Sequence, residues 1–338
     1  MAKNILVTGC CGYIGSHTCV ELLENGYSVV GIDNFSNSKK NVLDHIKKIT
    51  GKDIVFYEGD ILDSSILDQI FTENKFDSVI DFAAFKAVGE SVTKPIEYYI
   101  NNLSTLLNLL QNMKKHDVKK LIFSSSATVY GQQDKMPITE DFSVGGTTNP
   151  YGTSKLFAEK ILQDLYTADD RWNICILRYF NPVGAHKSGL IGEEPSGKPA
   201  NLMPFIVNVA LGKYEKVVVY GNDYDTVDGT GVRDYIHIVD LAKAHVKCLD
   251  KILIENGGMD IFNLGTGCPY SVLELINAFQ EVNDLTINYE IGARRTGDID
   301  IAYADPRKAE KELNWKAQYT IKDMCKDAYL FAINNLNA

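Results

Sequence analysis

The chain has 338 residues, of which 45% are hydrophobic and 10% aromatic, so it can bury one large domain or two unequal ones. Its formal net charge of −10 excludes a surface built to bind nucleic acid or anionic membranes, since both need clustered positive charge. No apolar stretch approaches the roughly 20 residues of a membrane span, and the N-terminus enters strand-like sequence without a signal-peptide core. We therefore expect a cytosolic protein.

The first half of the chain repeats a short apolar run, a turn with Gly or Asp, and a longer segment of helical spacing. This alternation is typical of parallel βαβ units. In chain order the runs are "NILVTG" (4–9), "SVVGID" (28–33), "IVFYEGD" (54–60), "SVIDFAA" (78–84), "KKLIFSSS" (119–126) and "ICILRYFN" (174–181). The first helix is expected over 14–25, before Gly26. The pattern predicts an α/β fold with a doubly wound parallel sheet of Rossmann type, its ligand crevice at the carboxyl ends of the strands.

After residue 181 the sequence becomes loop-rich, with many Gly and Pro, and a smaller mixed α/β lobe is expected to begin there. The strand-like run "DIFNLGTG" (260–267) suggests that the chain returns to the first sheet. The predicted domains are therefore 1–180, with a return near 236–266, and 181–338. We see no internal repeat of fixed period.

The first turn carries the glycine pattern of a dinucleotide site. Gly9, Gly12 and Gly15 in "TGCCGYIG" lie between the first strand and the first helix, where backbone N–H groups and the helix dipole attract a pyrophosphate. Asp33 ends the second strand, where a carboxylate binds the adenosine ribose hydroxyls and repels a 2′-phosphate. The pattern predicts NAD rather than NADP as cofactor. Asp60, after the third strand, is either an adenine contact or a solvated turn residue.

The segment "NPYGTSK" predicts a proton-transfer element. Asn149 can cap a helix that begins at Pro150, which places Tyr151 and Lys155 one turn apart on one face. A tyrosine acting as a base near neutrality needs its pKa lowered by about 3 units from about 10, and a neighbouring cation supplies much of that shift. Ser126 ends the fifth strand, where it can hydrogen-bond the tyrosine and a substrate hydroxyl. In isolation these residues would be a solvated helix face and a strand-end hydroxyl.

Seven cysteines are scattered without a CxxC pair, and none of the six histidines has a metal-type spacing such as HxxxH. We expect reduced thiols and no bound metal. Cys10 and Cys11 adjoin in the glycine turn, and they are either two small residues that fit or a redox pair.

Longer tracts identify a family resemblance. The chain resembles the extended short-chain dehydrogenases that act on nucleotide sugars, and among them those that epimerise UDP-hexoses at C4. The likeness runs nearly end to end, through "DNFSNS", "AVGESVTKPIEYY", "FSSSATVYG", "LRYFNPVGAH", "NLMPF" and "GTGVRDYIHIVDLA". It implies a homodimer and a NAD-binding first domain, with a UDP-sugar-binding lobe over 181–338.

The resemblance also implies a redox-neutral cycle on a tightly held NAD. Tyr151 takes the proton of the sugar 4-hydroxyl while hydride passes from C4 to the nicotinamide, and the 4-keto sugar turns over before the hydride returns. Lys155 lowers the pKa of Tyr151 and holds the nicotinamide ribose, and Ser126 positions the hydroxyl. UDP-galactose and UDP-glucose would thereby interconvert.

Site residues follow from the resemblance by position. Besides the glycines, the implied NAD contacts are Tyr13, Ile14, Asp33, Asn34, Phe35, Ser36, Asn37, Ser38, Asp60, Ile61, Phe82, Ala83, Ala84, Phe85, Lys86, Asn101, Ser126, Tyr151, Lys155 and Phe180. The implied UDP-sugar contacts are Ser126, Tyr151, Asn181, Asn201, Leu202, Tyr220, Arg233, Arg295, Asp298 and Ala302. Two placed arginines make sense in an acidic protein that must hold a diphosphate.

Two departures from the family pattern bear on function. Cys10 and Cys11 replace the usual small pair of the first turn, which is sterically tolerable and makes oxidant sensitivity a question. Ala302 stands where some relatives carry a tyrosine against the sugar 2-position, so we hypothesise that N-acetylated UDP-hexoses are also epimerised. Tyr303 is adjacent, and a shift of one residue would restore the bulky wall.

Two alternatives remain at this point. Nucleotide-sugar 4,6-dehydratases and UDP-glucuronate decarboxylases typically have an acidic residue just before "VYG", where this chain has Ala127 and Thr128. A non-catalytic NAD-binding sensor would not need Tyr151, Lys155 and Ser126 together.

Overall fold

The computed structural model describes residues 2–195, 197, 199, 201–295 and 298–336. The chain divides into two compact units. The first unit comprises residues 1–131, 143–178 and 242–262, and the second comprises 132–142, 179–241 and 263–338. Residues 132–142 thus group with the second unit, although they lie inside the predicted first domain of 1–180.

The first unit contains a seven-stranded sheet with the order β10-β6-β5-β4-β1-β2-β3. Its strands are β1 (Asn4–Thr8), β2 (Ser28–Asp33), β3 (Val55–Glu58), β4 (Ser78–Asp81), β5 (Lys120–Ser126), β6 (Asn173–Tyr179) and β10 (Gly258–Leu264). Strands β1 to β5 pair in parallel. The winding direction changes between β1 and β4, and in such sheets ligands bind at the carboxyl ends of the strands on either side of that point.

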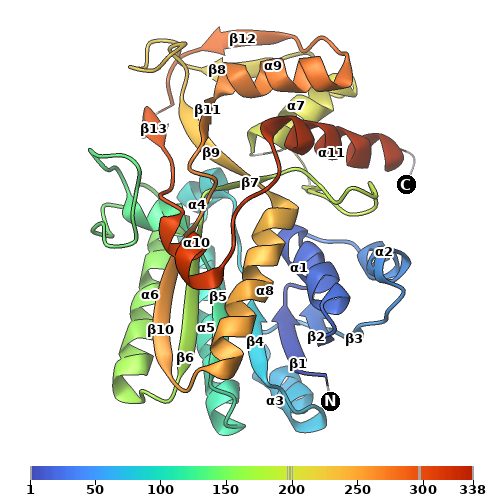
Figure 1. Ribbon diagram of the computed structural model, residues 1–338, viewed down its shortest axis with the longest axis vertical. Helices are drawn as coiled ribbons and strands as arrows, with labels where there is room; N and C mark the ends of the chain where they lie inside the picture. Colours follow the sequence, from blue (N-terminus) through green and yellow to red (C-terminus); the bar gives the residue numbers. More distant parts are fainter. Residues whose placement is uncertain (1, 196, 198, 200, 296–297, 337–338) are drawn as a thin grey trace. The chain divides into compact units, whose positions relative to one another are not determined.

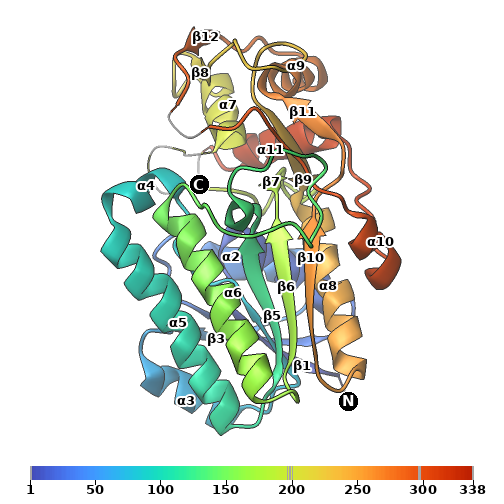
Figure 2. The same ribbon diagram turned by 90° about the vertical axis from the view of Figure 1, so that its left-hand side faces the viewer.

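Helices cover both faces of this sheet (Figure 2). On one face lie α3 (Ser64–Glu73), α5 (Pro95–Lys115) and α6 (Pro150–Ala168), with the short α4 (Val88–Thr93) just before α5. On the other lie α1 (Tyr13–Glu24), α2 (Asn41–Thr50) and α8 (Ile238–Ile254). A buried core joins the sheet to α3, α5 and α6, with Leu121 and Ile174 from strands against Leu109 and Leu162 from helices.

The predicted α/β doubly wound fold is confirmed. Each of the six apolar runs of the first half forms a strand, and the run at 260–267 returns as β10 beside β6. The first helix spans Tyr13–Glu24, one residue earlier at each end than expected. Gly26 follows it with a φ of 85°, which explains why a glycine ends this helix.

The second unit is a smaller mixed structure (Figure 1). Strand β9 (Val232–His237) pairs with β7 (Asn181–Val183), β11 (Pro269–Ser271) and β13 (Ile301–Ala302), while β8 (Val217–Tyr220) pairs with β12 (Tyr289–Gly292). Its helices are α7 (Leu202–Ala210), α9 (Val272–Asn283), α10 (Arg307–Leu313) and α11 (Ile321–Asn334). Phe279 and Met324 belong to its buried core. The segment predicted as loop-rich therefore contains three strands and a helix before β9 ends.

The expectation of reduced thiols is wrong at two positions. Cys175 of β6 and Cys248 of α8 form a disulfide across 73 residues of sequence. The β9–α8–β10 crossover lays α8 against the sheet beside β6, and no spacing in the sequence signals that approach. Within the described residues, no helix is long and apolar enough to cross a membrane.

Candidate active site

The start of α6 places the two proton-transfer candidates as predicted. The Asn149 side chain accepts a hydrogen bond from the Gly152 N–H at 2.9 Å, and Pro150 is the first helical residue. The cap fixes the helix start, so that Tyr151 and Lys155 lie one turn apart on the inner side of α6. Lys155 is buried and Tyr151 is partly buried.

The end of β5 binds this face of α6. Lys155 Nζ donates to the Ser124 carbonyl oxygen at 2.7 Å, and Ser126 hydrogen-bonds the Tyr151 phenol. Ser126 Oγ accepts from the Thr128 N–H at 3.3 Å and from the Thr128 hydroxyl at 3.0 Å. Because both Thr128 donors point at Ser126, the proton of the Ser126 hydroxyl is left for the phenol or for a substrate oxygen.

Burial governs the charge of both groups. It raises the pKa of Tyr151 to about 12, with the Ser126 hydrogen bond acting in the opposite direction. It lowers the pKa of Lys155 to about 8, opposed by the negative charges of Asp81 and Glu159. The expected lowering of the Tyr151 pKa by Lys155 is not seen, since the ammonium is directed at the Ser124 carbonyl oxygen.

The glycine turn between β1 and α1 is tightly packed. Gly9 has a φ of 63°, and a Cβ there would lie 3.2 Å from the Ala83 nitrogen. A Cβ on Gly15 would lie 2.2 Å from the Gly9 carbonyl oxygen, a distance that no side chain could occupy. Gly12 is the N-cap of α1 and has no side chain to bond the first-turn N–H groups. The positive end of the α1 dipole is therefore available to an anion, which fits a dinucleotide pyrophosphate.

The carboxylate at the end of β2 organises the adjoining loops. Asp33 accepts hydrogen bonds from the Cys11 N–H at 2.9 Å, the Phe35 N–H at 2.9 Å and the Ser38 hydroxyl at 2.8 Å. It links the glycine turn to the loop after β2. This is the strand end at which a ribose-binding carboxylate is expected.

The next strand ends supply further cofactor candidates. Asp60, beyond β3, accepts from the Asn34 side chain at 3.0 Å, and Ile61 after it is buried. Beyond β4, the Phe82 and Ala83 N–H groups both donate to the Thr8 hydroxyl at 3.2 Å. These bonds join neighbouring strands at their carboxyl ends.

The loop after Ala84 is held by α5. Phe85 donates its N–H to the Asn102 side chain at 2.8 Å, and Asn102 in turn donates to Ser154 of α6 at 2.9 Å. Lys86 Nζ lies 5.6 Å from the centre of the Tyr13 ring. The other candidates of this unit are Ile14 in the first turn of α1, Ser36 and Asn37 in the loop after β2, and Asn101 of α5 beside Asn102.

Cys10 and Cys11 are buried, with their sulfur atoms 3.8 Å apart. They fit because β2 carries Gly31, where a Cβ would lie 2.5 Å from the Cys10 sulfur. Together with Asp33 they bring three metal-type ligand atoms within 4.8 Å of one another. The Asp33 oxygens already bind donors of the surrounding loops.

The second unit gathers the predicted arginines. The Arg295 guanidinium lies 4.8 Å from the centre of the Tyr220 ring and pairs with Asp298 at 2.8 Å. Arg233 of β9 is mostly buried, and burial lowers its pKa despite the charge of Asp298. Two cations, of which Arg295 lies beside an aromatic ring, suit a diphosphate attached to a base and a sugar.

Register places the small residue beside this group. Ala302 of β13 pairs in parallel with Arg233 of β9, so that the two side chains share a face of the sheet. Asn181 of β7 donates to the Asp234 carbonyl oxygen at 3.0 Å. Asn201 precedes Leu202 at the start of α7 and donates to Glu193 at 2.9 Å. Phe180 also belongs to the second unit and is buried.

Sequence reasoning missed several residues in these groups. Thr128 stands two residues after Ser126, and Asn102 adjoins Asn101, so both lay inside tracts already singled out. The centre of the Tyr224 ring lies 3.8 Å from Cζ of Arg294. The charges of Arg233 and Arg295 also act on the Tyr224 phenol, which lies in a segment without a motif.

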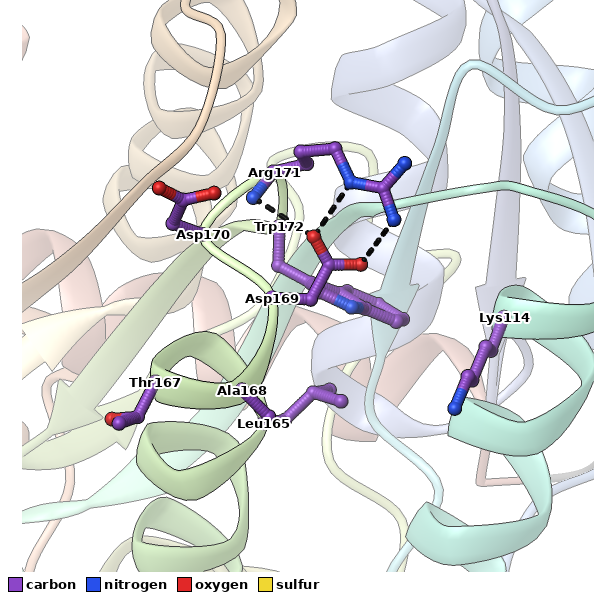
Figure 3. Close-up of a pocket in the computed structure, with 8 residues that line it drawn as sticks. All are labelled: Lys114, Leu165, Thr167, Ala168, Asp169, Asp170, Arg171 and Trp172. Carbon is purple, nitrogen blue, oxygen red and sulfur yellow. Dashed lines mark hydrogen bonds and ion pairs between the residues drawn. The ribbon is translucent and has the colours of Figure 1, made fainter.

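A cavity of about 620 Å³ lies near the amino-terminal end of β6, between the end of α6 and the start of that strand (Figure 3). Its lining includes Lys114, Leu165 and Trp172. Asp169, also in the lining, is ion-paired with Arg171 at 2.7 Å and with Lys119 at 2.9 Å. The cavity faces away from the strand ends that carry the candidate residues and contributes nothing to their chemistry.

Comparisons with known proteins agree with this geometry. Residues 6–328 match the family model described as GDP-mannose 4,6 dehydratase. A UDP-glucose 4-epimerase of Bacillus subtilis is 55% identical over 333 residues, covering 98% of both chains. A UDP-glucose 4-epimerase of Bifidobacterium longum, solved in complex with NAD+ and UDP, is 56% identical with a TM-score of 0.96 over 99% of both chains. Another from Stenotrophomonas maltophila, with bound NAD and formylated UDP-arabinopyranose, is 46% identical with a TM-score of 0.96 over 98% of both chains.

Proposed function

Because the chain belongs to the UDP-glucose 4-epimerases, we propose that it interconverts UDP-galactose and UDP-glucose by reversible oxidation at sugar C4. It is an isomerase and uses NAD as its cofactor. The observation that carries the assignment is the joint presence, in one unit, of the glycine turn, Asp33 and the group Ser126, Tyr151 and Lys155. Neither a sensor nor a lone nucleotide-binding module needs all of them.

The first unit fits NAD. The Gly9 and Gly15 backbone and the uncapped start of α1 would receive the pyrophosphate, and Asp33 the adenosine ribose. When bound, NAD supplies reversible hydride acceptance and positive charge. Lys155 would hold the nicotinamide ribose, and the loops that carry Phe82 and Lys86 would enclose the cofactor.

Tyr151 is the proposed proton acceptor and donor at the sugar 4-oxygen. Its pKa of about 12 makes it a neutral phenol at neutral pH, so it must gain positive charge nearby before it can take a proton. Ser126, with its hydroxyl proton free of Thr128, donates to the phenol oxygen or to the sugar hydroxyl and aligns the two. Loss of this proton together with the C4 hydride, which bound NAD would accept, gives a 4-keto sugar. With the hydride returned to the opposite face of C4, Tyr151 would give the proton back to the 4-oxygen.

The second unit would hold the UDP part of the substrate. Arg233 and Arg295 offer the two cations for the diphosphate, and Tyr220 offers an exposed ring. Asn181, Asn201, Leu202 and Asp298 complete the proposed contacts.

Ala302 supports a wider substrate range. It shares a strand face with Arg233, so it would lie beside the substrate, and its methyl group leaves room for an N-acetyl group at the sugar 2-position. UDP-GalNAc and UDP-GlcNAc are therefore proposed as further substrates.

Proton NMR of the purified protein with UDP-galactose and no added cofactor tests the proposal. Anomeric signals of UDP-glucose should appear, which would also show that NAD was carried through purification. If UDP-galactose stays unchanged even after NAD is supplied, the proposed reaction is wrong. Loss of water or carbon dioxide from a UDP-sugar would instead indicate the dehydratase or decarboxylase alternative, for which residues 127 and 128 provide no acid.

We also propose that the protein forms a homodimer through α5 and α6. Ile96 and Ile100 of α5 are 68% and 56% exposed, and Phe157 of α6 is 47% exposed and stacks on Tyr99. An exposed apolar stripe on two packed helices is typical of a protein interface. Light scattering after size exclusion should give twice the chain mass. Ile100→Glu should give monomers, whereas Val227→Glu, at an exposed position of the second unit, should not.

A further inference from the structure

Glu159 is a buried charge that the proposed reaction does not use. It lies on α6 one turn beyond Lys155 and is 6% exposed. Its carboxylate accepts from Arg178 Nε at 3.0 Å, from Arg178 Nη2 at 2.7 Å and from the Ser125 hydroxyl. Burying two charges is costly unless they are paired and fully hydrogen-bonded, so an ion pair in this position calls for a reason.

The Ser125 bond belongs to a register between β5 and α6. Three successive residues at the end of the strand bind three residues spaced one turn apart on the helix. The pairs are Ser126 with Tyr151, Ser124 with Lys155, and Ser125 with Glu159. Of the three helix residues in this register, Glu159 is the one outside the reacting group.

Arg178 extends the register to two further elements. It lies on β6, is 3% exposed, and donates from Nη1 to the Tyr130 hydroxyl at 2.8 Å. Its guanidinium also lies 4.7 Å from the centre of the Tyr130 ring. Tyr130 ends the short 3-10 helix η1 (Ala127–Tyr130), which begins directly after Ser126. One ion pair therefore connects α6, β5, η1 and β6 around the end of β5.

We propose that Glu159 and Arg178 are positioning residues for proton transfer, which hold Tyr151 against Ser126 and balance the charge of Lys155. The inference rests on the proposed function. Neither side chain touches the reacting atoms, so both act through their neighbours.

The charges around Lys155 explain how Glu159 and Arg178 affect its charge balance. The charged groups that act on it are Asp81 of β4 and Glu159 of its own helix. From β5 it meets only the uncharged Ser124 carbonyl and the Phe123 ring, whose centre is 4.9 Å from Nζ. Two carboxylates thus balance Lys155 and Arg178. Removing the charge of Glu159 leaves two buried cations with one carboxylate, and Lys155 then loses its proton at lower pH.

Glu159→Gln tests the charge balance at nearly constant shape. We expect KM for UDP-galactose to stay within about twofold, while the alkaline fall of kcat moves to lower pH by about one unit, or about tenfold in proton concentration. The double variant Glu159→Gln/Arg178→Met removes both charges and should return the alkaline fall to its wild-type pH. Asp164→Asn removes an exposed carboxylate that pairs with Lys160 on the same helix, and should change nothing.

Glu159→Asp tests the register, because it keeps the charge but shortens the reach by one methylene. We expect its kcat to fall about tenfold, because the hydrogen bond between Tyr151 and Ser126 is then formed for a smaller fraction of the time. The pH at which kcat falls on the alkaline side should not change. The inference would be overturned if kcat of Glu159→Gln fell at the same alkaline pH as in the wild type and kcat of Glu159→Asp equalled that of the wild type. Absence of wild-type turnover would count against the proposed function instead.

Discussion

The Lys155 ammonium lies 2.7 Å from the Ser124 carbonyl oxygen, so it hydrogen-bonds the backbone of β5 and is not directed at the Tyr151 phenol. The bond fixes a buried cation at the end of a strand. The ammonium therefore does not offset the effect of burial on Tyr151, which raises the pKa of the phenol to about 12. Proton transfer by Tyr151 therefore depends on charge that arrives with the ligands.

Stability should depend on pH through Lys155. Its folded pKa of about 8 lies below the unfolded value of 10.5, so between these values the unfolded chain binds the extra proton and the free energy of unfolding rises with pH. Relative to Lys155→Met, the wild type should gain up to roughly 3 kcal/mol across that window. Urea denaturation of both proteins at several pH values measures the difference. A constant difference would contradict the lowered pKa.

Tyr151→Phe should separate chemistry from cofactor binding. It removes the proton acceptor but not the glycine turn, so turnover should fall by about 10²–10⁴ while NAD stays bound. Activity by NMR and cofactor release on denaturation are the two measurements. Tyr99→Phe, on the stacked surface pair of α5 and α6, should keep full activity. Loss of NAD from Tyr151→Phe would mean that the phenol serves binding.

Gly15→Ala should disrupt the cofactor turn. The added methyl group would lie 2.2 Å from the Gly9 carbonyl oxygen, so the turn must open and NAD should be lost during purification. Gly89→Ala is the matched control, because a Cβ there meets nothing within 4 Å. Absorbance of the cofactor released from each protein reports the outcome. Equal NAD content in the two variants would show that the turn is not the binding site.

Ala302→Tyr should narrow the substrate range. A bulky ring beside Arg233 would occupy the space proposed for the N-acetyl group, so turnover of UDP-GalNAc should fall at least about tenfold, with UDP-galactose little affected. NMR rates on both substrates provide the comparison. If the wild type itself turns over neither N-acetyl sugar at high enzyme concentration, the hypothesis is wrong.

Much of the fold was predictable because its signals are local. A buried parallel strand is a short apolar run, and Asn149 with Pro150 is a helix start that can be read from two adjacent letters. The glycine spacing and Asp33 likewise lie within one βαβ unit.

The remaining features depend on residues distant in sequence. Glu159 meets Arg178 across 19 residues and Cys175 meets Cys248 across 73, and neither pair follows from spacing. The pKa of Lys155 depends on Asp81 of another strand. The loop-rich sequence after residue 181 concealed short strands, because β7 and β13 have too few residues to show a period.

The three-segment composition of the first unit has a consequence for its synthesis. Strand β10, which covers the outer side of β6, is the last strand of the sheet to leave the ribosome. Until then β6 is an open edge with unpaired N–H and C=O groups, a template for pairing with other chains. A truncated product of residues 1–180 would keep that edge permanently, so it should aggregate, and a soluble fragment of this unit needs residues 242–264 supplied as well.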